Sequence, residues 1–307
     1  MQILKDLNKD QWLAYKSKVI SSTEISSIFG ISPYATEFEI WHRKANASII
    51  SISENQRILW GSRLESAIAN GVAQDNNWDI RPMKEFYYDP KLRIGSSFDY
   101  CIVDKGVDKY ILEIKNVDSL IFKDGWIVDE EGDIEAPPHI EIQVQFQLMI
   151  SGLKEAYIAC LVGGNTVQLI KRSADEDIKK MMLTKVAKFW ESVDAGVPPE
   201  PNFEKDAEFI CSLYNVATVG KVADEKDNEE LKALALEYKM ESDIIKNAQV
   251  RKDAAKAKML TIIEDSEKAL GSGFSISAGI IGPTTVSYER KGYRNFKVYF
   301  KKEAQSE

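Results

Sequence analysis

The chain has 307 residues, of which 29% are charged, and a formal net charge of −8. This length accommodates one large domain or one domain with an appendage, and the acidic balance argues against a general nucleic-acid-binding protein, although a local basic patch can still hold phosphate. No apolar run is long enough to span a membrane, and the first residues lack the apolar stretch of a secretory signal. Three scattered cysteines fit neither a disulfide framework nor a Cys-x-x-Cys metal site, so we expect a protein of the reducing cytoplasm.

The first 76 residues are predicted to be mostly helical. Helices are expected over residues 8–18, after a capping tetrad at 21–24, after a turn at 33–36, and over 53–76. Within the capping tetrad, Thr23 is either an ordinary N-cap or a seat for phosphate, because its hydroxyl would lie beside free backbone N–H groups.

The helix predicted over 53–76 has Ser53 as its cap and carries one carboxylate on a partly apolar stripe. This residue is Glu65, which shares the stripe with Gly61 and Ile68. A carboxylate on such a stripe needs a partner, and the glycine one turn earlier leaves room for something to approach. Glu65 is therefore a candidate site residue, with a solvent-facing position at the edge of the stripe as the alternative.

A predicted hairpin over 94–116, with its turn at 104–106, carries the strongest chemical signal. Side chains on a strand alternate between its two faces, so Asp99, Glu113 and Lys115 are expected to converge on one side of the sheet. Two carboxylates and an ammonium are costly to hold on one face without a ligand, and hard oxygen ligands suit Mg²⁺. The alternative is an exposed hairpin with cross-strand ion pairs.

The elements around this hairpin are predicted in less detail. They are a strand over 79–88, a long acidic loop from 117 to 138, a helix over 140–151, two strands over 156–162 and 166–171, and an amphipathic helix over 175–195. In the helix over 140–151, Gln143 and Gln147 lie one turn apart. Such a glutamine ladder on a helix is more often solvated than functional.

The residues after about 202 differ in character. A long helix over 231–262 carries apolar residues at alternating three- and four-residue steps, a coiled-coil-like seam that Glu241 and Lys252 interrupt. Glycines at 271 and 273 break it, and short strands are expected over 274–277, 284–288 and 295–300. We therefore predict two parts, a domain over 1–202 and an appendage over 203–307, the latter made of a long helix and then short strands.

Six short motifs occur in an order that resembles the YqaJ viral recombinase family, phage-type exonucleases related to lambda exonuclease and the RecE nuclease. They are Trp12 with Lys16 ahead of the tetrad at 21–24, Gly-Ile-Ser-Pro-Tyr at 30–34, Trp-Gly-Ser-Arg-Leu-Glu at 60–65, Ser-Phe-Asp at 97–99, Leu-Glu-Ile-Lys at 112–115 and Gln-Val-Gln at 143–145. Their joint order on helix, helix, strand, strand and helix is more specific than any one of them. The resemblance covers roughly residues 10–200.

The resemblance implies an α/β fold with the PD-(D/E)XK restriction-endonuclease-like core, a mixed sheet flanked by helices. It implies that Asp99, Glu113 and the Ile114 carbonyl hold Mg²⁺, for which Mn²⁺ could substitute, and that Glu65 binds or orients the metal site from its helix. The chemistry would be phosphodiester hydrolysis, with no covalent enzyme intermediate.

The remaining site residues follow from the same resemblance. Lys115 would position or activate the attacking water, and Gln143 would lie next to it and the scissile phosphate. Lys16, Thr23 and Ser97 would form a pocket for a terminal 5′-phosphate. Lysine stands at position 16 where the family pattern has arginine, and a lysine cannot make the bidentate fork to phosphate. The tetrapeptide at 97–100 also departs from the usual Ser-Pro-Asp-Gly.

Relatives of this kind degrade one strand of a duplex from a 5′ end and leave a 3′ overhang. The resemblance thus implies a Mg²⁺-dependent 5′-to-3′ exonuclease that acts on the ends of double-stranded DNA during phage-type recombination. It also implies a trimeric ring, a single-strand annealing protein as partner, and a phage or prophage origin with activity in the bacterial cytoplasm.

Two other functions stay open from the residues alone. An endonuclease on the same core would use the same ligands, and a catalytically silent DNA-binding scaffold would share the fold. The intact set of Asp99, Glu113 and Lys115 argues against the scaffold. An iron–sulfur nuclease is disfavoured because such clusters generally require four cysteines and this chain has three.

Overall fold

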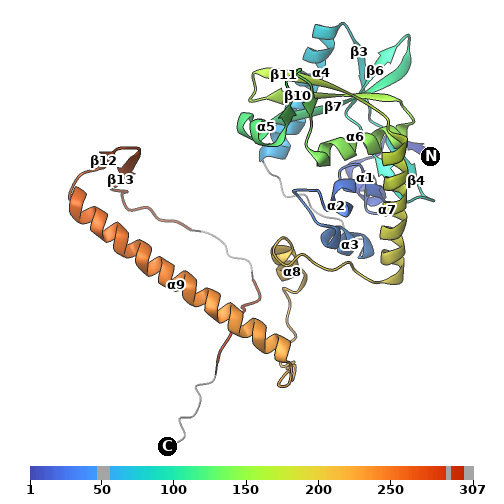
Figure 1. Ribbon diagram of the computed structural model, residues 1–307. Helices are drawn as coiled ribbons and strands as arrows, with labels where there is room; N and C mark the ends of the chain where they lie inside the picture. Colours follow the sequence, from blue (N-terminus) through green and yellow to red (C-terminus); the bar gives the residue numbers. More distant parts are fainter. Residues whose placement is uncertain (47–55, 288–291, 301–307) are drawn as a thin grey trace, which may run out of the picture. The chain divides into compact units, whose positions relative to one another are not determined.

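A five-stranded mixed sheet organises the first part of the chain in the computed structural model, which describes residues 1–46, 56–287 and 292–300 (Figure 1). The strand order is β11-β10-β7-β6-β3. Strands β7 and β10 are parallel and the other neighbours are antiparallel. The strands are β3 (Asp79–Pro82), β6 (Tyr100–Asp104), β7 (Val107–Val117), β10 (Glu155–Val162) and β11 (Thr166–Ser173).

Two helices cover the two faces of this sheet. Helix α4 (Gln56–Asn76) packs its Ile68 and Val72 against one face, where Leu112 of β7 is buried. Helix α6 (Pro138–Ser151) lies in the core on the other face, with Ile111 of β7. The predicted alternation along β7 is thus confirmed, and burying each large aliphatic side chain of these layers contributes about 1.5–3 kcal/mol.

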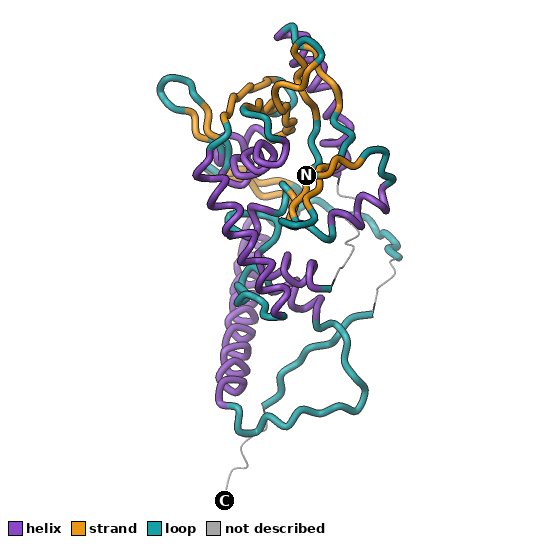
Figure 2. The backbone as a smooth tube through the Cα atoms, turned by 90° about the vertical axis from the view of Figure 1, so that its right-hand side faces the viewer, coloured by secondary structure: helices purple, strands orange, loops and turns teal. Residues whose placement is uncertain are grey.

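A smaller four-stranded sheet has the order β1-β4-β5-β2 and lies apart from the first, as the orange segments of Figure 2 show. Its strands are β1 (Gln2–Leu4), β2 (Ile20–Ser21), β4 (Phe86–Asp89) and β5 (Ile94–Ser96). Gly95 is required in β5, because a Cβ there would lie 2.7 Å from the ring of Phe86.

This second sheet corrects two predictions. The expected strand over 79–88 is split between β3, which pairs with β6 in the large sheet, and β4, which pairs with β1 and β5 in the small one. The chain leaves the large sheet after Met83, whose N–H makes the last bond to this neighbour, at the Asp99 carbonyl. The first run of the expected hairpin is also split, so that β5 belongs to the small sheet and β6 to the large one. Only the hairpin of β6 and β7 forms as predicted.

The four predicted N-terminal helices are present in the described residues. They are α1 (Lys9–Lys16), α2 (Ile25–Ile28), α3 (Glu37–Ala45) and α4. Glu24 is the N-cap residue of α2 and makes no capping bond through its side chain, so the prediction of Thr23 as the cap is wrong. Thr36 caps α3, whereas Ser53 lies outside the described residues.

The acidic stretch after β7 is more ordered than the predicted loop. It contains α5 (Ser119–Gly125) and a hairpin of β8 (Ile127–Val128) and β9 (Ile134–Glu135). Asp118 caps α5, and the buried Trp126 stacks on Phe122 at a ring distance of 5.1 Å. The capping aspartate and the aromatic pair therefore stabilise regular structure in a segment that was predicted to be a loop.

The last predicted elements of this part are confirmed. Helix α6 ends at Gly152, whose φ of 76° is the left-handed conformation that glycine adopts most readily. Strands β10 and β11 pair along their whole length, and α7 (Glu176–Ala195) buries Met182 and Trp190. Helix α8 (Ala207–Leu213) follows.

The chain divides into two compact units, Met1–Ile210 and Cys211–Glu307. The described part of the second unit contains α9 (Glu229–Ile263), which forms over the predicted range, and a hairpin of β12 (Lys268–Gly271) and β13 (Phe274–Ser277). Ser272 and Gly273 make the turn of that hairpin, with Gly273 at a φ of 83°, so the prediction overlooked β12. No strand forms over 284–287 or 295–300, where two were expected. In the described part of the chain, no helix is both long and apolar enough to cross a bilayer.

Candidate active site

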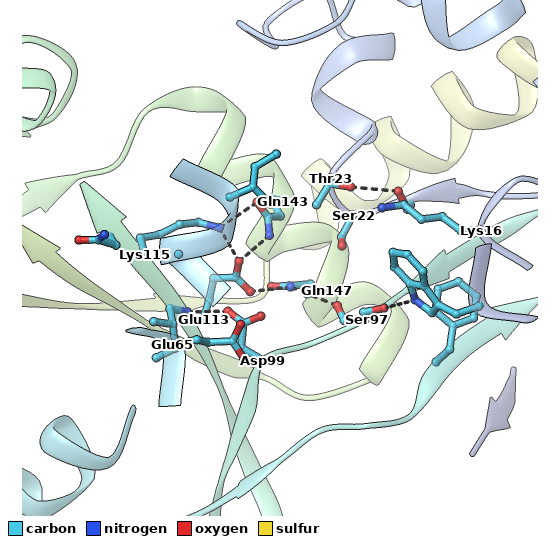
Figure 3. A pocket seen from close by; sticks show the side chains of 17 residues that line it. Lys16, Ser22, Thr23, Glu65, Ser97, Asp99, Glu113, Lys115, Gln143 and Gln147 are labelled. Atoms are coloured by element: carbon cyan, nitrogen blue, oxygen red, sulfur yellow. Dashed lines mark hydrogen bonds and ion pairs between the residues drawn. The ribbon is translucent and has the colours of Figure 1, made fainter. Parts of the chain in front are cut away.

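A cavity with a volume of about 560 Å³ lies in the first unit, and every predicted site residue lines it (Figure 3). Its lining draws on α1, the turn after β2, α4, the segment before β6, β7 and α6. The nine predicted residues that it brings together are Lys16, Thr23, Glu65, Ser97, Asp99, Glu113, Ile114, Lys115 and Gln143.

We call the part of the cavity around Glu65, Asp99, Glu113 and Lys115 the carboxylate end. Glu113 is only 2% exposed and lies on the face of β7 that α6 covers. Its Oε1 accepts hydrogen bonds from Lys115 Nζ at 2.5 Å and from Gln143 Nε2 at 2.6 Å. Lys115 Nζ also donates to Gln143 Oε1 at 3.3 Å, so the three groups form a closed triangle.

Gln147 is a site residue that sequence reasoning missed. Its side chain is 1% exposed, and its Nε2 donates to Glu113 Oε2 at 2.7 Å. Gln143 and Gln147 are four residues apart on α6 and therefore share a face. The signal was present as a pair of amides one turn apart on an otherwise apolar helix, which is costly unless both amides find partners.

Asp99 reaches this end by a different route from the predicted one. The chain leaves the small sheet after β5, buries Phe98, and brings Asp99 beside β7 before β6 begins. There Asp99 Oδ2 accepts a hydrogen bond from the backbone N–H of Ile114 at 2.8 Å. The side chain of Ile114 is packed in the core on the α4 face, so the residue faces the cavity with its backbone.

The carboxylate end carries an excess of negative charge. Burial and the neighbouring Glu113 raise the pKa of Asp99 well above its usual value, and the same two causes raise the pKa of Glu65. Burial alone would lower the pKa of Lys115, but Glu113 and Asp99 outweigh it and raise that pKa. One ammonium thus faces three carboxylates, and it stays protonated.

The donors of this end fit a hard divalent cation in kind and in charge. Carboxylate, backbone carbonyl and amide oxygens are the ligands of Mg²⁺, and a cation would relieve the repulsion that raises the pKa of Asp99. Gln147 Oε1 is buried and has no hydrogen-bond partner among the described atoms, which leaves an acceptor available in the same lining. No three His, Cys, Asp or Glu side chains in the described ranges are already grouped as a metal cluster.

We call the opposite side of the cavity, around Lys16, Thr23 and Ser97, the basic end (Figure 3). Trp12 Nε1 donates to Ser97 Oγ at 2.9 Å, and Lys16 Nζ lies 4.8 Å from the centre of the Trp12 ring. Thr23 Oγ1 lies 3.2 Å from Ser21 Oγ. Burial lowers the pKa of Lys16, and the nearby Glu24 offsets this effect only in part. A bound anion would therefore stabilise the charged form of Lys16.

A buried ion pair supports the basic end from behind. Lys44 Nζ donates to Glu24 Oε1 at 2.8 Å, to Glu24 Oε2 at 2.9 Å and to the Lys16 carbonyl at 3.0 Å. Glu24 Oε2 also accepts from the Ser21 N–H at 3.0 Å. Burial opposes the charge on Glu24, but Lys44 and Lys16 outweigh it and lower the pKa of Glu24. One ion pair thus ties α1, the turn after β2 and α3 together.

Comparison with known proteins gives the same resemblance as the motifs. Residues 11–154 match the model of the YqaJ-like viral recombinase domain. The uncharacterized protein YqaJ of Bacillus subtilis (strain 168) is 28% identical over 207 residues, which cover 66% of this chain and 62% of that relative. This chain therefore spans less than two thirds of the length of YqaJ, and the predicted family resemblance is confirmed.

Solved structures show the fold. An alkaline exonuclease from Laribacter hongkongensis, LHK-Exo, superimposes with a TM-score of 0.50 at 14% identity, covering 67% of this chain and all (100%) of that chain. A putative exonuclease from Eubacterium rectale has a TM-score of 0.47 at 11% identity, covering 72% of this chain and 97% of its own. The likeness to LHK-Exo confirms the predicted α/β fold, a mixed sheet flanked by helices.

Proposed function

We propose that this chain is a Mg²⁺-dependent 5′-to-3′ exonuclease that degrades one strand of linear double-stranded DNA and leaves a 3′ overhang. The observation that carries the proposal is the single cavity with Asp99, Glu113 and Lys115 at one end and Lys16, Thr23 and Ser97 at the other. The YqaJ-like domain supports it, as does the nuclease-type fold that this chain shares with a protein described as an alkaline exonuclease.

Lys115 is the group that we assign to the attacking water. Two of its three N–H bonds are directed to Glu113 and Gln143, and the third is left to hold a water or a phosphate oxygen. Because its pKa is raised, Lys115 remains an ammonium, so it orients the water and offsets charge on the phosphate. Gln143 and Gln147 hold Glu113 in place from α6.

Asp99, Glu113, the Ile114 carbonyl and Glu65 would hold the Mg²⁺, and Mn²⁺ would substitute for it. When bound, such an ion lowers the pKa of a coordinated water and stabilises charge on the phosphate and the leaving oxygen. The hydrogen bond from the Ile114 N–H keeps Asp99 beside β7. Gln147 fixes the second oxygen of Glu113.

The basic end would hold the terminal 5′-phosphate. Lys16 supplies the positive charge, and the hydroxyls of Thr23 and Ser97 supply hydrogen bonds. A phosphate held there would present the next linkage toward the carboxylate end, which sets a 5′-to-3′ direction. Because a lysine binds phosphate as a point charge rather than as a fork, we expect a moderate preference for 5′-phosphorylated ends.

The biological setting is part of the same proposal. We assign the chain to phage-type recombination, as a phage or prophage product of the bacterial cytoplasm that works with a single-strand annealing protein. The three cysteines, Cys101, Cys160 and Cys211, are all free. A homotrimeric ring around the duplex would keep the enzyme on its substrate.

Digestion of linear and closed circular duplex DNA with Mg²⁺ tests the reaction class. We expect linear DNA to be degraded and closed circles to remain intact. Cleavage of the circles would show an endonuclease on the same core, and DNA binding without loss of either substrate would show a silent scaffold. Lys115→Ala protein is the control for a contaminating nuclease.

A further inference from the structure

Helix α9 presents a long apolar seam that the described chain leaves open. None of its 35 residues is buried. Along the seam the exposed fractions are 48% for Leu231, 54% for Leu234, 70% for Ile245, 42% for Met259 and 80% for Ile262. Phe296 touches Tyr238 edge-on, and Tyr238 still keeps 49% of its surface exposed. Because helices in proteins gain most of their stability from packing an apolar face, we expect this seam to pack against another surface.

The seam of one helix is complementary to the seam of a second, antiparallel copy of the same helix. Its two charged members, Glu241 and Lys252, lie at nearly equal distances from the middle of α9. Two antiparallel copies of the helix can therefore align so that each charged residue meets the opposite one. The same alignment pairs Leu231 with Ile262, Leu234 with Met259, Tyr238 with Ala255, and Ile245 with Ala248.

The residues that flank the seam obey the same alignment. On this flank, one position before alternate seam residues, contacts across an antiparallel pair are diagonal rather than directly opposite. Glu230 lies diagonally across from Lys258, Glu237 from Arg251, and Ile244 from its own copy. Acidic residues gather in the first half of this flank and basic residues in the second. A parallel, in-register pair would instead place Glu241 against Glu241 and Lys252 against Lys252, which is unfavourable in an apolar seam.

We propose that α9 binds α9 of a second copy of this chain as an antiparallel two-stranded coiled coil. The apolar layers supply the driving force, and the two Glu241–Lys252 contacts select the direction and the register at some cost in stability. The N-terminal ends of the two helices lie at opposite ends of a rod about 50 Å long. The pairing is independent of the nuclease reaction.

Charge exchange in the full-length protein tests the pairing. Glu241→Lys places Lys against Lys252 twice per pair, so we expect sedimentation equilibrium to show association at least about tenfold weaker. Lys252→Glu has the same effect, and the double variant Glu241→Lys/Lys252→Glu restores wild-type association. Circular dichroism shows whether each variant keeps its helix content. Equal masses for all four proteins would overturn the proposal, and they would fit a helix that folds back on its own chain or binds another protein.

Disulfide trapping tests the direction. In a Cys211→Ser background, Leu234→Cys and Met259→Cys proteins are each oxidised alone and as a mixture. We expect a cross-linked dimer only in the mixture, because position 234 of one copy meets position 259 of the other. A dimer of the Leu234→Cys protein alone would show a parallel pair and contradict the proposal, as would the absence of any cross-link in the mixture.

Discussion

The two ends of the cavity are built in different ways. At the carboxylate end, Glu113 receives hydrogen bonds from Lys115, Gln143 and Gln147, which lie on one strand and one helix. At the basic end, Lys16 lies on a short helix that a buried ion pair ties to its surroundings. At the carboxylate end, the site side chains hold one another in place by direct hydrogen bonds. At the basic end, the backbone that carries the site residues is held in place by an ion pair between other residues. Changes at the first should act on the chemical step, and changes at the second on the recognition of DNA ends.

The largest effect is expected for Lys115→Ala. In the proposed reaction Lys115 orients the water and offsets charge, so without its ammonium cleavage should fall by about 10³-fold while DNA binding is retained. Single-turnover digestion and a binding titration measure the two quantities. Lys109→Ala, on the exposed part of β7, is the matched control. Near-normal cleavage by the Lys115 variant would remove this residue from the mechanism.

Gln147→Leu tests whether the orientation of Glu113 matters. If Glu113 holds Mg²⁺ as proposed, losing the hydrogen bond to its Oε2 should lower the maximal rate about 10–100-fold, the usual effect of removing a residue that orients a metal ligand. The control is Gln145→Leu on the same helix, since Gln145 bonds to the backbone of Ser173 and Asp175 and not to Glu113. Equal losses of rate in both variants would reduce the role of Gln147 to helix packing.

Lys44→Met tests the support of the basic end. It leaves Glu24 buried without its main partner, so the free energy of unfolding should fall by about 3–5 kcal/mol. The double variant Glu24→Gln/Lys44→Met should recover much of this loss. Urea denaturation measures both. A single variant as stable as the wild type would show that the pair does not hold this end together.

Lys16→Ala tests whether the basic end recognises the 5′-phosphate. We expect digestion of 5′-phosphorylated ends to slow about tenfold relative to 5′-hydroxyl ends, because a charge-assisted contact to phosphate is lost. Lys9→Ala, at the exposed start of the same helix, should leave the ratio unchanged. If both kinds of end slow equally in the Lys16 variant, the 5′-phosphate pocket is elsewhere.

The smallest effect is expected for Asp99→Asn, in thermal stability. The pKa of Asp99 is raised in the folded protein, so its charged form is penalised there and stability falls as pH rises through that pKa. In Mg²⁺-free buffer, Asp99→Asn should raise Tm by a few degrees at pH 8, about what 1 kcal/mol produces. The difference should vanish at acidic pH, below the pKa of an unfolded aspartate. An unchanged Tm at pH 8 would contradict the excess negative charge at the carboxylate end.

The carboxylate end shows where sequence reasoning succeeds. Strand alternation is a local property, so the placement of Glu113 and Lys115 on one face of β7 could be predicted. Asp99 was predicted at the right place for the wrong reason, because the strand that should carry it is broken and its position depends on a bond to Ile114 N–H. The role of Gln147 could not be predicted, because only the packing of α6 on β7 shows that its amide meets Glu113.

The basic end shows where sequence reasoning fails. Only the family resemblance brings Lys16 and Thr23 together, because no periodicity in the sequence relates them. The ion pair of Glu24 and Lys44 joins residues twenty positions apart through tertiary packing, and no local pattern marks it. The hairpin of β8 and β9 was likewise missed, because two-residue strands leave little alternation to detect.

The most direct test of the two-ended cavity is digestion of one linear duplex, labelled at either its 5′ or its 3′ ends, with Mg²⁺ and with a chelator. We expect 5′ label to be released first and 3′ label to remain on a lengthening single strand, with no reaction in the chelator. Early release of 3′ label, or cleavage that persists without a divalent cation, would contradict the account.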